Sequence, residues 1–475
     1  MLYNKILLMM AFSCFFTNCS KSSNPGNDGN PPPTPPGKTD SAIVWLTRSD
    51  GTVLLKQQSS IAFNAAANSY ATITIDSAIS YQAIDGFGYT LTGGSAQVIN
   101  TLDANTKNNL LQELFGNTSN SIGINYLRIS IGASDLNAEV FSYDDVAGDT
   151  GLVHFTLDKD KTDLIPLLKE IIRINPSIKI LATPWSAPAW MKDNNNTIGG
   201  SLKAEYYNVY ANYFVNYIQA MQAEGITIDA ITPQNEPLNP GNNPSMVMQS
   251  GDEATFIKNN VGPAFAAANI STKIIVYDHN CDQPSYATSI LNDIDAAKYV
   301  DGSAFHLYAG DINALSTVHN AFPDKHVYFT EQFTSSNGQF AGDFIWHIKN
   351  VVIGSMNNWS RTALEWNLAN DASYGPHTPG GCTECKGALT ISGTVTRNVA
   401  YYILAQIAKF VPAGSVRIKS DAVSGLYNVA FKTPAGKKVL LILNDGSTAI
   451  NVNIKFKDKM AVANLPAGSA ATYTW

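Results

Sequence analysis

Hydrophobic and polar positions follow three different patterns along the chain. From residue 41 to about residue 80, segments such as SAIVWLTRS and SYATITIDS alternate apolar and polar residues, which is typical of half-buried β-strands. From 81 to 410, short β-rich runs alternate with stretches whose apolar residues recur every three or four positions, the period of an amphipathic helix. From 411 to 475 the strand pattern returns. The sequence therefore predicts strand-rich segments on both sides of a mixed α/β region.

The central region contains eight strand-like runs. They are AIDGFGYTL, INYLRISIG, KILATPWS, DAITPQNEP, KIIVYDHN, VDGSAFHLY, KHVYFTEQF and RTALEWNL. Eight such units predict an α/β fold of the (β/α)8 TIM-barrel type over residues 81–410, with its active site at the carboxyl ends of the strands. An open doubly wound sheet would alternate similarly, but polar residues end nearly every run and GFGYTLTGG lacks the spacing of a phosphate loop. Residues 41–80 and 411–475 together predict an attached β-sandwich side domain.

The N-terminal segment indicates export. Residues 1–19 place an apolar stretch, too short to span a bilayer, between Lys5 and Cys19. Residues 20–40 are rich in Pro, Gly, Ser and Asn, the composition of a flexible tether. This arrangement resembles a bacterial lipoprotein lipidated at Cys19, and a plain secretory signal is the alternative. We expect a membrane-anchored periplasmic or cell-surface protein, or otherwise a secreted one.

The net charge and the cysteines indicate which binding partners and bound metals to expect. A net charge of -7 without clustered Lys and Arg argues against a nucleic-acid partner. In an oxidising compartment, Cys382 and Cys385 in GGCTECKG predict a local disulfide. Half of a zinc site is the alternative, but it needs two more ligands and the seven His are scattered. We therefore expect no bound metal.

Two glutamates at strand ends are the strongest candidates for chemistry. Glu236 in ITPQNEP ends the fourth run and Glu331 in VYFTEQF ends the seventh, so the two should face each other across the barrel mouth. Retaining glycoside hydrolysis needs two carboxyl groups about 5 Å apart. A solvated loop carboxylate is the alternative for either residue, but Asn235 can bind a sugar hydroxyl and Pro237 fixes the chain direction. We assign Glu236 as general acid and base and Glu331 as nucleophile, a pair that requires no cofactor.

These motifs together resemble glycoside hydrolase family 30, which contains the glucosylceramidases and β-1,6-glucanases. GFGYTLTGGSA, YLRISIGASDL and TPWSAPAWMK are similar to the family's first three strands, and AFHLY and EWNL to its sixth and eighth. The resemblance covers nearly the whole mature chain. It implies a retaining β-glycosidase with a TIM barrel and a side β-sandwich, and it implies the same roles for Glu236 and Glu331.

The resemblance also implies a set of supporting residues. Arg128 would be a buried cation near the nucleophile, with a purely structural salt bridge as the alternative. Asp135, Trp185 and Asn235 would contact the sugar at the cleavage point, although Trp185 could simply be packed.

Two further strand ends complete the expected substrate-binding set. His306 and Tyr308 alternate at the end of the sixth run and so point the same way. The resemblance places them beside Glu331. Trp366, at the end of the eighth run, is the candidate for stacking against a sugar ring.

The loop ANDASYGPHTPGGCTECKGALTI after the eighth run should form one wall of the cleft. Its pattern most resembles the β-1,6-glucanase group, so an endo-acting β-1,6-glucanase is the first expectation. A glucuronoxylanase would need a cation near the cleft, where the sequence supplies only Lys386 before Arg397. An exo-β-glucosidase or a glucosylceramidase-like enzyme is the alternative activity, and a carbohydrate-binding lipoprotein without catalysis is the non-enzyme alternative.

Overall fold

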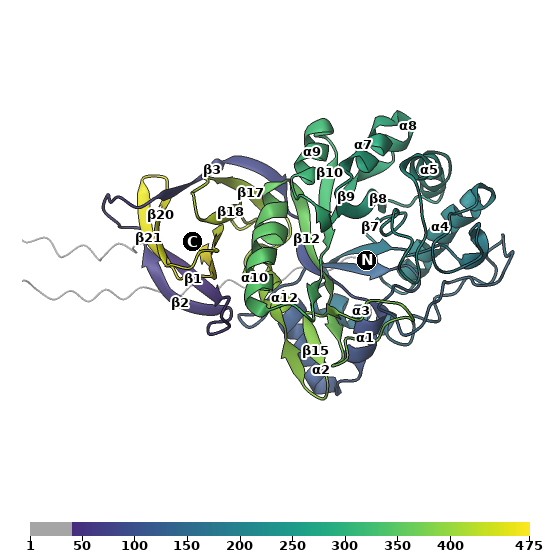
Figure 1. Ribbon diagram of the computed structural model, residues 1–475, viewed down its shortest axis with the longest axis horizontal. Coiled ribbons are helices and arrows are strands. Elements are labelled where there is room, and N and C mark those ends of the chain that lie inside the picture. The colour runs from purple at the N-terminus through teal and green to yellow at the C-terminus, as the bar shows by residue number, and fades with distance from the viewer. Residues whose placement is uncertain (1–39) are drawn as a thin grey trace, which may run out of the picture. The chain divides into compact units, whose positions relative to one another are not determined.

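The computed structural model describes residues 40–475 (Figure 1). The expected export signal, the Cys19 lipidation site and the tether up to residue 39 lie outside the described residues. Within 40–475, no helix combines the length and the apolar character needed to cross a bilayer.

The centre of the molecule is a closed barrel of eight parallel strands, as the alternating pattern predicted. Each expected run overlaps one of them, and neighbouring strands pair in chain order until β12 closes onto β4. The strands are β4 (Gly86–Thr90), β5 (Tyr126–Ser130), β6 (Lys179–Thr183), β7 (Ala230–Ile231), β8 (Lys273–Cys281), β9 (Val300–Gly310), β10 (His326–Glu331) and β12 (Ser360–Asn367).

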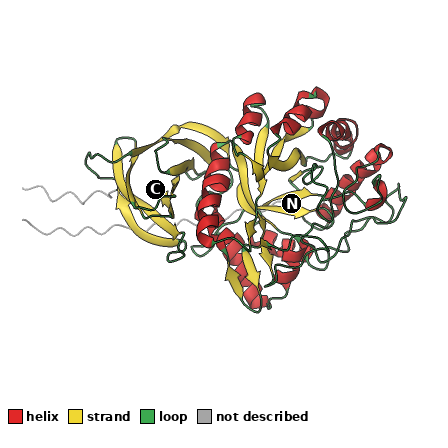
Figure 2. Cartoon of the chain, in the orientation of Figure 1, coloured by secondary structure: helices red, strands yellow, loops and turns green. Residues whose placement is uncertain are grey.

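Helices connect these strands and surround the barrel (Figure 2). The segment LIPLLKEIIRI illustrates why they form, because its apolar residues at helical spacing, including Leu164, Leu168 and Ile171, are buried against the core. The α-helices are α1 (Gly93–Asn100), α2 (Ala104–Phe115), α3 (Leu164–Ile174), α4 (Tyr207–Ala223), α5 (Ser250–Phe256), α6 (Gly262–Ala267), α7 (Pro284–Asn292), α8 (Ile294–Ala297), α9 (Ala314–Ala321), α10 (Phe340–His347), α11 (Ser355–Asn357) and α12 (Val399–Ala408).

The strand-rich segments from both chain ends combine in one sheet of nine strands. Its order is β2-β1-β22-β19-β18-β17-β3-β20-β21, so the first and last strands of the described chain, β1 and β22, pair with each other. It encloses a separate apolar core that includes Ile73, Leu440 and Ile454. The strands are β1 (Ser41–Arg48), β2 (Lys56–Ala62), β3 (Thr72–Ala83), β17 (Val416–Ser420), β18 (Tyr427–Lys432), β19 (Lys438–Asn444), β20 (Ile450–Phe456), β21 (Lys459–Leu465) and β22 (Ser469–Thr474).

One buried glutamine joins this β-sandwich to the barrel. Gln406 on α12 accepts a hydrogen bond from Thr47 Oγ1 at 2.7 Å and donates to the carbonyl of Trp45 at 3.0 Å. Its Nε2 also donates to Thr472 Oγ1 at 2.9 Å. Because these partners come from β1 and β22, both chain ends are attached to the same barrel helix.

The long loop after β12 has short strands of its own. β14 (Cys385–Lys386) pairs with β11 (Thr334–Ser335), which follows β10 directly. β13 (Ala369–Asn370), β15 (Leu389–Ile391) and β16 (Val395–Arg397) form a second small sheet. The loop is therefore hydrogen-bonded to the segment just beyond Glu331, at the carboxyl end of the barrel.

Candidate active site

The two glutamates selected from the sequence lie at the same end of the barrel. Glu236 is in the loop after β7, and Glu331 is the last residue of β10. His306 on β9 lies close to both: its Nδ1 is 3.2 Å from Oε1 of Glu236 and 3.8 Å from Oε1 of Glu331. The two carboxylate oxygens are therefore within 7.0 Å of each other, the sum of these distances.

Two donors hold the carboxylate of Glu331. Nη1 of Arg128 donates to Oε2 at 2.5 Å, and the hydroxyl of Tyr308 donates to Oε1 at 2.9 Å. Arg128 is fully buried on β5, so its charge acts with little screening by water. Both oxygens of Glu331 thus have a partner that favours the ionised form.

Arg128 also organises the base of the site. Its Nη2 donates to Oδ1 of Asn235 at 2.6 Å and to Oδ2 of Asp278 at 2.8 Å. Its guanidinium carbon lies 4.9 Å from the ring centroid of Trp185. The two interpretations of Arg128 therefore do not exclude each other, because it forms a buried ion pair with Asp278 and contacts Glu331 as well.

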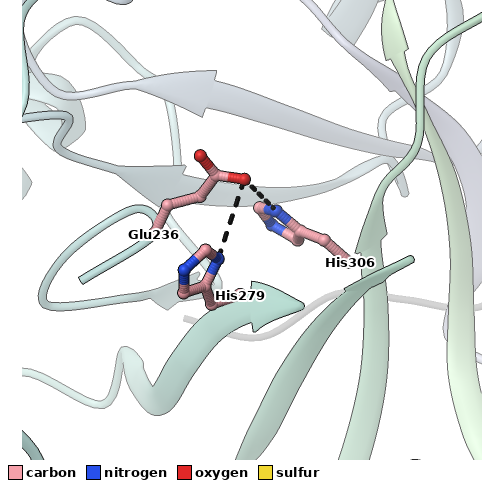
Figure 3. A group of neighbouring side chains, drawn as sticks. All are labelled: Glu236, His279 and His306. Carbon is pink, nitrogen blue, oxygen red and sulfur yellow. Dashed lines mark hydrogen bonds and ion pairs between the residues drawn. The ribbon is translucent and has the colours of Figure 1, made fainter. Parts of the chain in front are cut away.

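Glu236 has a different set of neighbours (Figure 3). Besides His306, the Nδ1 atom of His279 on β8 lies 3.7 Å from its Oε1. Its Oε2 accepts hydrogen bonds from Asn239 at 2.7 Å and Asn242 at 3.4 Å. The backbone of Glu236 has a φ of 44°, and its N–H donates to the carbonyl of Asp278 at 3.0 Å. A left-handed backbone at a non-glycine residue costs about 1–3 kcal/mol and is concentrated at functional sites.

The charged groups of the site shift one another's pKa. Burial would raise the pKa of Glu236, but the hydrogen bond and positive charge of His306 outweigh burial and hold it at about 2. Burial would lower the pKa of His306, but Glu331, Asp278 and Glu236 raise it to about 9. Burial raises the pKa of Glu331, against the attraction of His306 and Arg128. Because these groups titrate together, we treat His306 and Glu236 as a pair that holds one proton at neutral pH.

The two glutamates open into a pocket of about 300 Å³. Four of the residues expected to contact the sugar line it: Asp135, Trp185, Tyr308 and Trp366. The side chains of Trp185 and Trp366 are only 1% and 4% exposed and pack against each other at 5.3 Å, so they form the floor and leave little ring area free. The remaining lining residues are Glu236, Asn239, Asn242, Asn280, Glu331, Phe333, Cys382 and Cys385.

Two expected substrate contacts lie outside this lining. His306 is 0% exposed and is bonded to Glu236 and to Asp278, so it lies behind the carboxylates instead of in the pocket. Asn235 directs its Oδ1 to Arg128, which leaves only its Nδ2 group to reach a substrate.

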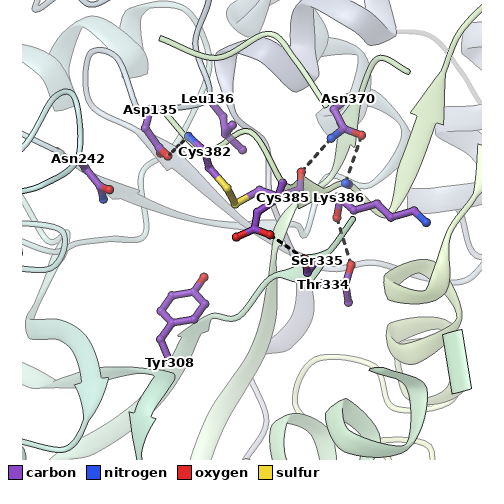
Figure 4. Close-up of a disulfide and its surroundings, with 12 residues drawn as sticks. Asp135, Leu136, Asn242, Tyr308, Thr334, Ser335, Asn370, Cys382, Cys385 and Lys386 are labelled. Atoms are coloured by element: carbon purple, nitrogen blue, oxygen red, sulfur yellow. Dashed lines mark hydrogen bonds between the residues drawn. A yellow bond between two sulfur atoms is a disulfide. The ribbon is translucent and has the colours of Figure 1, made fainter. Parts of the chain in front are cut away.

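A disulfide between Cys382 and Cys385 forms part of the pocket wall (Figure 4). The backbone N–H of Cys382 donates to Oδ2 of Asp135 at 3.2 Å, and Nδ2 of Asn370 donates to the carbonyl of Cys385 at 2.9 Å. Burial and the charge of Glu331 raise the pKa of Asp135 to about 7. The loop after β12 therefore contributes both a wall and a donor for one of the expected sugar-binding residues.

Sequence reasoning missed several residues of the site. Asp278 and His279 end the fifth strand run, and Asn239 and Asn242 follow Glu236 in the same loop. The rule that strand ends carry chemistry would have found Asp278 and His279 had it been applied to the fifth run. The asparagines had no such signal, because loop geometry alone brings them to Glu236.

A larger groove of about 580 Å³ lies away from the glutamates, between Phe115, Asn175 and Phe410. The residues that line it in the described chain include no Asp or Glu. It therefore cannot supply a pair of carboxyl groups, and the smaller pocket is the candidate active site.

A TIM barrel with facing carboxyl groups at the ends of its fourth and seventh strands defines a glycoside hydrolase. The particular family follows from comparison with known proteins: the chain belongs to glycosyl hydrolase family 30. Residues 84–411 match the TIM-barrel domain of that family, and residues 414–473 match its β-sandwich domain.

Glucanases and glucosylceramidases are both among the curated relatives that match the chain. An endo-1,6-beta-D-glucanase from Aspergillus fumigatus is 36% identical over 82% of this chain and 85% of its own length. The lysosomal acid glucosylceramidase of Mus musculus is 28% identical over 85% and 83%. Among solved structures, an endo-beta1,6-glucanase superimposes with a TM-score of 0.85 at 34% identity, covering 92% of this chain and 99% of the other.

Proposed function

We propose that this protein is a retaining endo-β-1,6-glucanase in which Glu331 is the nucleophile and Glu236 the general acid and base. The observation that carries the proposal is the closeness of the two carboxyl groups, whose Oε1 atoms are at most 7.0 Å apart, the sum of their distances to Nδ1 of His306. Retaining glycosidases keep these groups about 5–5.5 Å apart, and inverting ones about 6.5–9.5 Å. The upper limit of 7.0 Å for this protein therefore reaches only the lowest part of the range of separations found in inverting enzymes.

In the first step, Glu331 attacks the anomeric carbon while Glu236 protonates the departing glycosidic oxygen. Arg128 and Tyr308 orient Glu331 through their hydrogen bonds. The proton for the leaving oxygen comes from the His306–Glu236 pair, whose atoms are 3.2 Å apart. A sugar in the pocket removes water from Glu236, and this desolvation favours its neutral, protonated form.

In the second step, water attacks the glucosyl–Glu331 ester, and Glu236 takes up the proton of that water. The bond between the sugar and Glu331 breaks, and the carboxylate returns to Arg128 and Tyr308. The product retains the β configuration because the anomeric carbon is inverted twice.

Several neighbours suit a neutral sugar. Asp135 is 6% exposed and can accept from sugar hydroxyls, and Asn239, Asn242 and Asn280 line the same pocket. The lining residues of the described chain include no Lys or Arg, so a glucuronic acid branch would find no cation there. This favours a glucan over a glucuronoxylan.

The 1,6 linkage is supported by the relatives named endo-1,6-beta-D-glucanase and by the loop with Cys382 and Cys385, whose pattern resembles that group. A glucosylceramidase-like or exo-β-glucosidase activity is the second candidate, because the relatives named glucosylceramidase also match most of the chain. Both activities would use the same two carboxyl groups.

Product analysis on linear β-1,6-, β-1,3- and β-1,4-glucans, xylan and glucosylceramide tests the proposal. We expect β-1,6-linked oligosaccharides of several lengths as early products from the β-1,6-glucan. Glucose alone from chain ends would favour the exo-acting alternative. NMR of the first product should show the β-anomer, and an initial α-anomer would rule out the retaining mechanism. Binding of glucan without release of reducing ends would identify a carbohydrate-binding protein.

We propose that the protein is exported and anchored through a lipid on Cys19, with β-glucan at the cell surface or in the periplasm as its substrate. The segment that carries the signal lies outside the described residues, so the proposal rests on its sequence. The Cys382–Cys385 disulfide fits an oxidising compartment. Metabolic labelling with a radioactive or clickable fatty acid should label the full chain and leave a Cys19→Ala variant unlabelled.

A further inference from the structure

Three side chains beside the pocket bring potential metal ligands together (Figure 3). One potential ligand atom from each of Glu236, His279 and His306 lies within 4.8 Å of the other two. Oε1 of Glu236 is 3.2 Å from His306 Nδ1 and 3.7 Å from His279 Nδ1. Ligands bound at about 2.0–2.1 Å around a tetrahedral zinc ion are about 3.3 Å apart. The spacing around Glu236 is close to the edges of such a tetrahedron.

His279 provides an independent sign of a missing partner. Its side chain is 10% exposed, yet its Nδ1 atom has no hydrogen-bond partner among the described residues. Buried polar atoms are nearly always paired, because an unpaired one costs about 1–3 kcal/mol. Burial lowers the pKa of His279, which favours the neutral imidazole that binds metals.

Residues around Glu236 and His306 form hydrogen bonds of the kind that orient the ligands of bound metals. Nε2 of His306 lies 3.1 Å from Oδ1 of Asp278, and such a carboxylate commonly orients a metal-binding histidine. Asn239 donates to Oε2 of Glu236 at 2.7 Å, which leaves Oε1 for an ion. These contacts fix two of the three ligands in place before any ion arrives.

We propose that Glu236, His279 and His306 form an inhibitory site for a divalent transition-metal ion such as Zn²⁺. A fourth position would be filled by water. The ion takes the place of the proton shared by His306 and Glu236, so the carboxyl group can no longer protonate a leaving oxygen. The inhibition rests on the role proposed for Glu236, whereas the binding of the ion does not.

The charge of the surroundings favours a dication. The carboxylates of Asp278, Glu236 and Glu331 all lie within 4 Å of a nitrogen of His306, and Arg128 is the cation paired with two of them. The same carboxylates that raise the pKa of His306 to about 9 also attract a metal ion, which carries twice the charge of the proton it replaces.

Calorimetric titration of the mature chain with Zn²⁺ alone tests the binding without any substrate. We expect one saturable site, and Co²⁺ in its place should give the intense visible absorption of a tetrahedral ion. Zn²⁺ should inhibit hydrolysis of an aryl β-glucoside, with full recovery after a chelator. No saturable binding by the wild-type chain would overturn the proposal. Binding without inhibition would instead leave the metal site standing and contradict the role of Glu236.

Matched variants locate the site. His279→Gln and Glu236→Gln should each weaken Zn²⁺ binding at least about tenfold, since each removes one of three ligands. His154→Gln is the control, because His154 pairs with Asp149 at 2.9 Å on an exposed part of the barrel. Equal affinity in His279→Gln and wild type, or loss of binding only in His154→Gln, would refute the site. Circular dichroism checks that each variant folds, and the Co²⁺ spectrum of the wild type tests the site independently of any substitution.

Discussion

Both ends of the barrel bury carboxylates, but the two ends differ in how many of these carboxylates are paired with cations. At the amino end, Asp85 accepts two hydrogen bonds from Arg361 at 2.9 Å and one from Lys179 at 2.8 Å. Although Asp85 is buried, these two cations lower its pKa. Asp301 is likewise paired with Lys273 and His326, and its pKa is also lowered. Asp85 and Asp301 thus each have at least one Lys or Arg partner.

At the carboxyl end, four buried carboxyl groups surround the site, and one guanidinium bonds to two of them. Arg128 bonds to Asp278 and Glu331, while Glu236 and Asp135 have no Lys or Arg partner among the described residues. The pKa of Asp135 is raised to about 7, and burial raises that of Glu331 as well. Titratable groups poised in this way are suited to proton transfer, whereas matched pairs are suited to stability. The comparison predicts that substitutions at the carboxyl end lower enzymatic activity, whereas substitutions at the amino end lower the stability of the fold.

The largest expected effect is on turnover in Glu331→Gln. Removing the nucleophile should lower kcat on an activated aryl β-glucoside by at least about 10⁴-fold. Because burial disfavours the charge of Glu331, its thermal unfolding midpoint should not fall. Glu384→Gln is the control, since Glu384 is an exposed carboxylate in the same pocket-wall loop, bonded to Ser335 and Asn337. Undiminished turnover in Glu331→Gln would exclude it as nucleophile.

Glu236→Gln should lose activity in a way that depends on the leaving group. Loss of general acid catalysis should cost about 10²–10⁴-fold on glucan, whose leaving alcohol needs a proton. An aryl glucoside with a good leaving group should lose less in its first step, and added azide should restore turnover by giving a β-glucosyl azide. Equal losses on both substrates, without azide rescue, would count against Glu236 as acid and base.

Substitution at the amino end should produce the opposite result. Asp85→Asn removes the partner of Arg361 and Lys179, which are 18% and 35% exposed, so water compensates in part. We expect a loss of about 2 kcal/mol in the free energy of unfolding, measured in urea. The kcat of the folded fraction should stay near the wild-type value. A large fall in kcat would contradict the assignment of stability to the amino end and activity to the carboxyl end.

The pH profile should reveal the proton shared by His306 and Glu236. Because the folded-state pKa of His306 is raised to about 9, the pair keeps its proton below that pH and loses it as the pH rises through it. Wild-type kcat/KM should therefore fall above about pH 9. In His306→Asn, Glu236 alone must hold the proton, so the alkaline limb should move down by at least one pH unit. An unchanged limb would show that His306 only packs the site.

The sequence predicted the barrel and the main charged residues at its carboxyl end, but not every contact around them. Period and strand-end residues were enough for the eight barrel strands and for placing Glu236 and Glu331 at the same end of the barrel. Arg128 was pointed to by the family resemblance alone. Asn239 and Asn242 could not be assigned in this way. Their contacts with Glu236 depend on loop geometry, including the positive φ of Glu236 itself. The exposure of Trp366 likewise depends on how Trp185 packs against it.

The smallest expected effect is that of the disulfide in the pocket wall. Cys382→Ser with Cys385→Ser should free the loop whose N–H donates to Asp135, without touching either glutamate. One neutral hydrogen bond is worth about 1 kcal/mol, so KM for the glucan should rise by up to about fivefold while kcat changes less. A mild reductant should have the same effect on the wild type and none on the double variant. Asp135 is also one of the carboxyl groups at this end that have no Lys or Arg partner among the described residues. A change in kcat larger than the change in KM would therefore mean that the loop affects the charge of the active site as well as the binding of the sugar.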